Sequence, residues 1–187
     1  MRCHSEKIIL LFICFLFAFS QRAFSAFILI PMDEDQRNHL KAYGLAYWIV
    51  QRETETDWLL NYRGGSFMFP YDKVCEDECK IRGITFQIIA DAQAAAIRLE
   101  ISDTQVNMET VNLHKAPRIA VYSPKNKLPW DDAVTLVLSY AEIPYDVIYD
   151  EEVMTGILPL YDWLHLHHED FTGQYGKFWA AYKSFPW

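Results

Sequence analysis

The sequence predicts an α/β protein built on an open, mostly parallel sheet with helices on both faces. Apolar runs of strand length alternate with longer segments of helical period. The run Arg118–Tyr122 is almost continuously apolar, which is typical of a strand that is buried on both faces of a parallel sheet. Short turns join each strand to the next helix, as in right-handed β-α-β crossovers. We interpret residues 26–115 as an N-terminal α/β unit and residues 116–187, where these crossovers are predicted, as the start of a second α/β domain.

Composition excludes two classes of protein. The 187 residues are 51% hydrophobic and 22% charged, so the chain is too apolar for a disordered protein and long enough for one domain or two small ones. The formal net charge is −8. Because phosphate binding needs a basic face, no nucleic-acid partner is expected.

Residues 1–25 are expected to be a cleaved secretory signal peptide. Arg2 and Lys7 precede the uncharged apolar run Ile8–Phe19, which is too short to span a membrane comfortably. Ala23 and Ser25 are small residues that fit cleavage before residue 26. We therefore expect an exported protein, periplasmic or extracellular, with no stable membrane span after cleavage. An uncleaved anchor is the alternative.

Cleavage leaves two cysteines, Cys75 and Cys79, in the chain. Their spacing on a predicted helix places them one turn apart. In an oxidising compartment they form a small local disulfide or remain reduced thiols. A metal pair or a redox centre is the alternative, although the C-x-x-C redox pattern is absent.

In the first unit we predict four strands and three helices. The strands are Phe27–Met32, Asp57–Asn61, Ser66–Phe69 and Ile84–Ala90. The helices are Asp33–Gln51 with Asp33 as N-cap, Asp72–Arg82 ending at Gly83, and Asp91–Ile101. The polar stretch Ser102–Lys115 has weak periodicity, so we interpret it as the boundary between the units.

In the second unit strands and helices alternate strictly. The predicted strands are Arg118–Tyr122, Tyr145–Tyr149 and Asp162–His167. The predicted helices are Trp130–Ala141, Glu151–Ile157 and Gln174–Ser184. No strand follows the last helix, so we expect the sheet to be incomplete at the C-terminus and the chain to be truncated.

The histidines of the segment 165–170 are the first candidate site. His165 and His167 would share one face of a strand, which makes them a possible zinc or nickel pair, with Glu169 or Asp170 supplying oxygen. His168 is a further ligand-binding candidate. The segment lies at the carboxyl end of a predicted strand, where open α/β sheets place their ligands. The alternative is that His165 and His167 pack under a helix and that residues 168–170 form a polar turn.

The segment Arg63-Gly64-Gly65 is the second candidate. Paired glycines let backbone N–H groups approach an anion, and the Arg63 guanidinium could bind a carboxylate or a phosphate. The alternative is a bend that needs positive φ angles. The chain contains no G-x-S-x-G elbow, so no catalytic nucleophile is named.

Five segments of the chain resemble a family of exported proteins labelled asparagine synthetase B-like. They are residues 30–50, 57–69 (DWLLNYRGGSFMF), 79–86, 118–153 and 162–178 (DWLHLHHEDFTGQYGKF), which together cover most of the mature chain. The resemblance implies that the second unit begins a flavodoxin-like domain similar to class I glutamine amidotransferases. In longer relatives this sheet continues past the position of residues 185–187 toward a Cys-bearing turn, which this chain lacks.

Three functions are considered. The first is a binding module that holds a small molecule or an envelope protein near His165, His167 and Glu169. The second is a hydrolase or amidotransferase on a carbohydrate or envelope amide, in which His167 or Glu169 is the general base and a missing C-terminal part supplies the nucleophile. The third is the glutamine-hydrolysing asparagine synthetase that the family label implies. The S-G-G-x-D-S loop of that enzyme class does not occur in this sequence.

Overall fold

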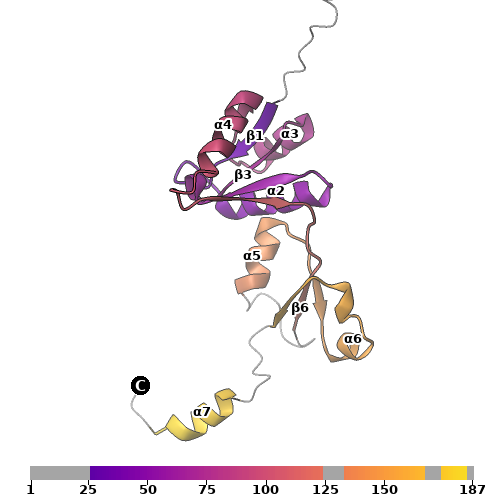
Figure 1. Ribbon diagram of the computed structural model, residues 1–187. Coiled ribbons are helices and arrows are strands. Elements are labelled where there is room, and N and C mark those ends of the chain that lie inside the picture. Colours follow the sequence, from indigo (N-terminus) through magenta and orange to yellow (C-terminus); the bar gives the residue numbers. More distant parts are fainter. Residues whose placement is uncertain (1–25, 124–132, 167–173, 185–187) are drawn as a thin grey trace, which may run out of the picture.

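The computed structural model describes residues 26–123, 133–166 and 174–184, which form two sheets of different kinds (Figure 1). The segment predicted to be a signal peptide, residues 1–25, lies outside this part of the chain. Among the described residues, none of the helices has the length and apolar character needed to cross a membrane.

The first unit builds an antiparallel sheet with the strand order β4-β1-β3-β2-β5. Its strands are β1 (Ala26–Ile30), β2 (Thr56–Leu60), β3 (Ser66–Pro70), β4 (Gln87–Ala90) and β5 (Glu109–Leu113). The prediction of a mostly parallel sheet is therefore wrong for this unit. Helices cover both faces of the sheet, so its inner strands are apolar on both sides, and this pattern does not distinguish parallel from antiparallel pairing.

Three helices enclose this sheet. The helices α2 (His39–Gln51) and α3 (Lys73–Ile81) cover one face, and α4 (Asp91–Ile101) covers the other. Strand β1 shows the alternation, because Ile28 and Ile30 pack with α2 and α3 whereas Leu29 packs with α4. The result is a three-layer unit with a separate core on each face of the sheet.

Helix α2 begins five residues later than predicted, because Asn38 and not Asp33 is its N-cap. The Asn38 side chain accepts a hydrogen bond from the N–H of Lys41 at 3.1 Å. The preceding loop is fixed by the buried side chain of Gln36. Its amide donates to the carbonyl of Pro31 at 2.9 Å, and its oxygen accepts from the N–H of Thr85 at 3.1 Å.

Strand β5 occupies part of the stretch that we interpreted as a boundary. It pairs with β2 along its whole length and forms one edge of the sheet. An edge strand exposes many of its side chains, so its sequence ETVNL has no continuous apolar run. The connection between the two sheets is thereby reduced to residues 114–118.

The second unit contains a three-stranded parallel sheet with the order β7-β6-β8. Its strands are β6 (Ile119–Tyr122), β7 (Asp146–Ile148) and β8 (Trp163–Leu166), and its parallel pairing agrees with the prediction. Helix α5 (Ala133–Ala141) connects β6 to β7, and α6 (Asp150–Met154) with the short 3-10 helix η3 (Leu158–Leu160) connects β7 to β8. These connections run to opposite edges of the sheet, so right-handed crossovers place α5 and α6 on opposite faces. Helix α7 (Gln174–Tyr182) follows.

Helices α2 and α5 join the two units (Figure 1). Glu142, at the end of α5, pairs with Lys41 of α2 at 2.5 Å and with Arg82 at the end of α3 at 3.2 Å. Tyr47 of α2 donates a hydrogen bond to the carbonyl of Pro117 at 2.8 Å. The junction between the units therefore combines helix packing with ion pairs and a hydrogen bond to the connecting segment.

Candidate functional site

The predicted histidine site is described only in part. His165 is half-buried on β8, where it is the register partner of Val121 on β6. His167, His168 and Glu169 lie outside the described residues, so the metal pair and the general base remain predictions. Within the part of the chain that the structure describes, no three His, Cys, Asp or Glu side chains form a group that could hold a metal ion.

A buried serine lies at the same end of the parallel sheet. Ser123 follows β6 directly, and its N–H donates to the carbonyl of Ile148 at 3.0 Å, which extends the pairing with β7 by one bond. Its side chain is only 2% exposed. Its hydroxyl has no hydrogen-bond partner among the described residues. An unsatisfied buried hydroxyl costs about 1–3 kcal/mol, so a partner from outside the described residues would stabilise this side chain.

The register brings Ser123 and His165 to one face. Side chains alternate along a strand, so Val121 and Ser123 point to the same side of β6. His165 pairs with Val121 and shares that side. Thr135, in the first described turn of α5, is buried as well. The carboxyl ends of β6 and β8 thus place a hydroxyl and an imidazole over the α5 face of the sheet.

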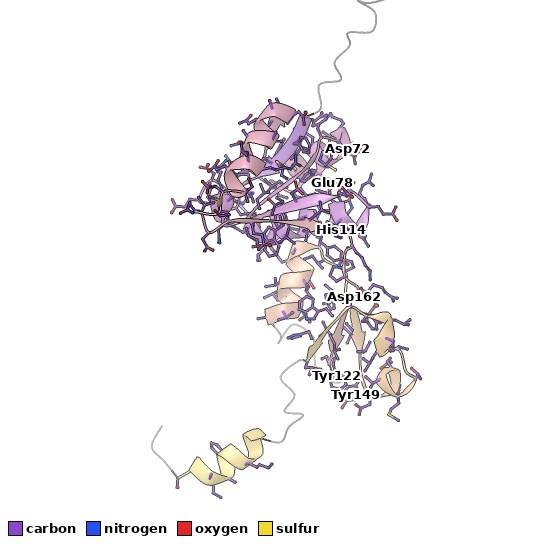
Figure 2. The ribbon with its side chains drawn as sticks, in the orientation of Figure 1. Asp72, Glu78, His114, Tyr122, Tyr149 and Asp162 are labelled. Atoms are coloured by element: carbon purple, nitrogen blue, oxygen red, sulfur yellow. The ribbon has the colours of Figure 1, made fainter. Side chains whose placement is uncertain are left out.

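On the other face of the parallel sheet, at the same end, lie two tyrosines and the acidic first turn of α6. Tyr122 and Tyr149 have ring centroids 5.2 Å apart, and they lie together at the end of the sheet opposite Asp162 (Figure 2). The hydroxyl of Tyr122 donates to Asp150 Oδ1 at 2.5 Å. The carboxylate of Glu152 accepts the N–H of Tyr149 at 2.9 Å. These acids stabilise the start of α6, where the helix dipole favours negative charge.

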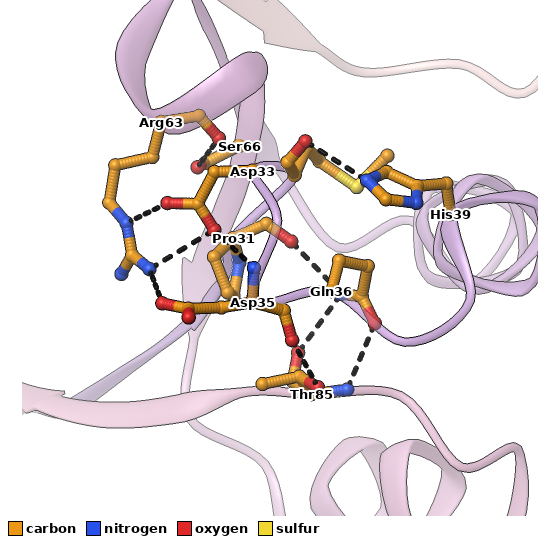
Figure 3. Close-up of polar contacts among 9 residues, drawn as sticks. Pro31, Asp33, Asp35, Gln36, His39, Arg63, Ser66 and Thr85 are labelled. Carbon is orange, nitrogen blue, oxygen red and sulfur yellow. Dashed lines mark hydrogen bonds and ion pairs between the residues drawn. The ribbon is translucent and has the colours of Figure 1, made fainter.

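The Arg63-Gly64-Gly65 segment lies in the other sheet, between β2 and β3 and largely within the short 3-10 helix η1 (Tyr62–Gly64). The Arg63 guanidinium donates through Nε to Asp33 Oδ2 at 2.6 Å and through Nη2 to Asp35 Oδ2 at 2.6 Å (Figure 3). The hydrogen bond from Arg63 holds the pKa of the Asp33 carboxyl below its usual range. Two carboxylates of the chain thus bind the group that we predicted to bind an external anion.

The two glycines let the backbone turn against the loop before α2. Both have positive φ angles, 80° for Gly64 and 94° for Gly65. A Cβ at Gly64 would lie 2.3 Å from the carbonyl oxygen of Met32. The N–H of Met32 donates to the carbonyl of Arg63 at 3.0 Å. The geometry of the bend, our alternative interpretation, accounts for these glycines; the ligand-binding role of Arg63, Gly64 and Gly65 stays a prediction.

The cysteines Cys75 and Cys79 are free thiols buried between α3 and the antiparallel sheet. Burial raises the pKa of Cys75 to about 11 and that of Cys79 to about 12. At neutral pH both are therefore protonated and weakly nucleophilic. They act as small apolar core residues and lie in a different unit from Ser123 and His165.

Comparisons with protein-family models, with curated proteins and with solved structures find no match to this chain.

Proposed function

We propose that this chain is an exported α/β binding protein that holds a small carboxamide-bearing molecule at the carboxyl ends of β6 and β8. The observation that carries the proposal is the buried hydroxyl of Ser123 at this end of the sheet, which has no hydrogen-bond partner in the described part of the chain. In open α/β sheets, ligands bind outside the carboxyl ends of the strands, where the connections diverge to opposite edges. In the order β7-β6-β8 that point lies between β6 and β8.

A serine hydroxyl suits a carboxamide because it can donate to the carbonyl oxygen and accept from the NH₂ group. His165 adds a second donor or acceptor on the same face of the sheet. The strand order, with α5 and α6 on opposite faces, is that of the first three strands of a flavodoxin-like sheet. This order supports the proposal that the second unit is related to class I glutamine amidotransferases.

Neither of the two described thiols can serve as the nucleophile of a catalytic site at these strand ends. A glutaminase of this kind uses a reactive cysteine, whereas Cys75 and Cys79 are buried in the other unit with raised pKa values. One observation favours the hydrolase or amidotransferase as a second candidate. Leu164 and Leu166, which share one face of the edge strand β8, are 38% and 46% exposed, as expected if further helices pack on that face in a complete catalytic domain.

The test is a titration of the full chain with L-glutamine, followed by backbone amide NMR. We expect saturable shifts at Tyr122, Ser123 and His165, and at least about a tenfold loss of affinity in Ser123→Ala. Ser102→Ala removes an exposed hydroxyl at the end of α4 in the other unit and should leave the affinity unchanged.

Zinc serves as the second probe in the same experiment. If zinc causes NMR shifts that are lost on substitution of His165 but not of Ser123, the strand ends bind a metal ion and not a carboxamide. The proposal is wrong if L-glutamine causes no saturable shift at the strand ends, or if Ser123→Ala and Ser102→Ala bind it equally well.

A further inference from the structure

A cavity of about 240 Å³ lies at the junction of the two units, away from the strand-end residues Ser123 and His165. Helix α2, the antiparallel sheet, the connecting segment and the second unit all contribute to its wall. The residues that decide its chemistry are Tyr43, Tyr47, Trp58, Phe67, Leu113 and Ile143.

Flat aromatic rings form one wall of this cavity. The rings of Trp58 and Phe67 are nearly parallel, with centroids 6.1 Å apart and an angle of 21° between their planes. The ring of Tyr43 meets Phe67 edge-on at 5.6 Å. Such an arrangement offers both stacking and edge contacts to another planar ring.

Three polar side chains around the cavity, those of Trp58, Tyr47 and Lys115, already have partners, whereas the Tyr43 hydroxyl has none among the described residues. Trp58 Nε1 donates to the carbonyl of Gly65 at 3.1 Å, and the Tyr47 hydroxyl donates to the carbonyl of Pro117 at 2.8 Å. At the rim, Lys115 pairs with Asp162 at 2.6 Å. A ligand with many polar groups would therefore lose most of its hydrogen bonds to water without replacing them, whereas a largely apolar ligand would gain from desolvation.

The volume limits the size of this ligand. A dry apolar cavity of about 150 Å³ accepts a benzene molecule, so about 240 Å³ has room for two fused rings. We propose that the junction cavity binds a small, uncharged aromatic molecule of the size of indole. Because Ile143 belongs to the second unit and the other walls to the first unit and the connection, the bound ring contacts both units and stabilises their packing.

The probe for this site is indole itself, titrated into the full chain by calorimetry, with D-glucose as a polar probe of similar size. We expect saturable indole binding with a Kd of about 1 mM or tighter and no binding of glucose. Ala116→Phe fills the cavity from the connecting segment and should weaken indole binding at least about tenfold. His114→Phe adds the same ring at an exposed neighbour outside the cavity and should leave the affinity unchanged.

NMR signals of the unsubstituted chain, from its methyl groups and from the Trp58 side chain, give a measurement that does not depend on the folding of a variant. Indole should shift the Trp58 Nε1–H signal and the methyl signals of Leu113 and Ile143. The inference is overturned if these signals do not move, if glucose binds as well as indole, or if Ala116→Phe, once folded, keeps the original affinity.

Discussion

Gly44 of α2 lies so close to Ala141 of α5 that a Cβ at position 44 would be 1.7 Å from the Ala141 carbonyl oxygen. Glycine in the middle of a helix costs about 1 kcal/mol relative to alanine. Here it allows the backbones of two helices from different units to approach each other. The contact also brings Lys41 of α2 within reach of Glu142, the residue after Ala141.

Gly44→Ala should therefore destabilise the protein although alanine is the better helix former. The added methyl group forces α2 and α5 apart, at a net cost of about 1–3 kcal/mol. Urea denaturation measures this as a lower midpoint. Gly176→Ala in α7, where a Cβ would meet no atom within 4 Å, is the control and should leave stability equal or slightly higher. Equal stabilities of Gly44→Ala and the original chain would show that the helices do not pack as described.

Glu142→Gln should lower stability at neutral pH by less than about 1 kcal/mol, because Glu142 is half-exposed and its ion pairs are screened by solvent. The hydrogen bond from Lys41 lowers the pKa of Glu142 from its ordinary value of 4.5. A carboxyl whose pKa is lowered in the folded state stabilises the protein fully at pH values above its ordinary pKa. This contribution is lost as the pH falls through the folded-state pKa. The difference between the variant and the original chain should therefore shrink below about pH 4.

Urea midpoints at pH 7 and pH 3 test this prediction. A difference that grows on acidification would contradict the assignment of Glu142 as an ionised partner of Lys41 and Arg82.

Arg63→Gln should release the loop that precedes α2. The substitution removes the hydrogen bonds to Asp33 and Asp35, at a cost of about 1–2 kcal/mol for a partly buried pairing of two carboxylates with one guanidinium. Hydrogen exchange should become faster for the N–H of Gln36, which donates to the carbonyl of Asp33. Arg37→Gln changes an exposed arginine of the same loop and should affect neither quantity. Equal exchange rates in the two variants would argue against the role of Arg63 in fixing this loop.

Cys75 and Cys79 should react with a thiol reagent such as dithionitrobenzoate only when the protein unfolds. Their burial and raised pKa values leave almost no accessible thiolate at pH 8. We expect both thiols to react rapidly in 6 M guanidinium chloride and slowly in buffer. With Cys3 and Cys14 replaced by serine, rapid reaction of the native protein would contradict the place of Cys75 and Cys79 in the core.

Much of the secondary structure was predictable from local patterns. The helices around Cys75 and at 91–101, and the apolar strand at 119–122, follow from periodicity, capping residues and continuous apolar runs. The antiparallel pairing of the first sheet was not predictable. Strand direction depends on how the strands are connected and ordered in the sheet, and β1 is apolar on both sides with either pairing because helices cover both faces.

Our prediction of where α2 begins was wrong because contacts between residues far apart in the sequence outweigh local ones. Asp33 has the chemistry of an N-cap, but Arg63, thirty residues further on, binds its carboxylate. The side chain of Gln36 bonds to Thr85, which is more distant still. Sequence spacing contains no signal for either partner.

The sequence predicted where in the fold the candidate site lies, but not all of its residues. His165 was expected at the carboxyl end of a strand and lies on β8, as predicted. Ser123 was missed, although a small polar residue directly after a continuously apolar strand was a usable signal. It became a candidate because it is buried without a hydrogen-bond partner among the described residues, which only the three-dimensional packing reveals.

The most direct test of the account is a crystal structure of the full chain with L-glutamine. The account predicts the ligand's carboxamide at hydrogen-bond distance, about 2.7–3.0 Å, from Ser123 Oγ, with His165 on the same side of the sheet. A structure in which Ser123 Oγ is bonded to another group of the chain, with no ligand at the ends of β6 and β8, would contradict it.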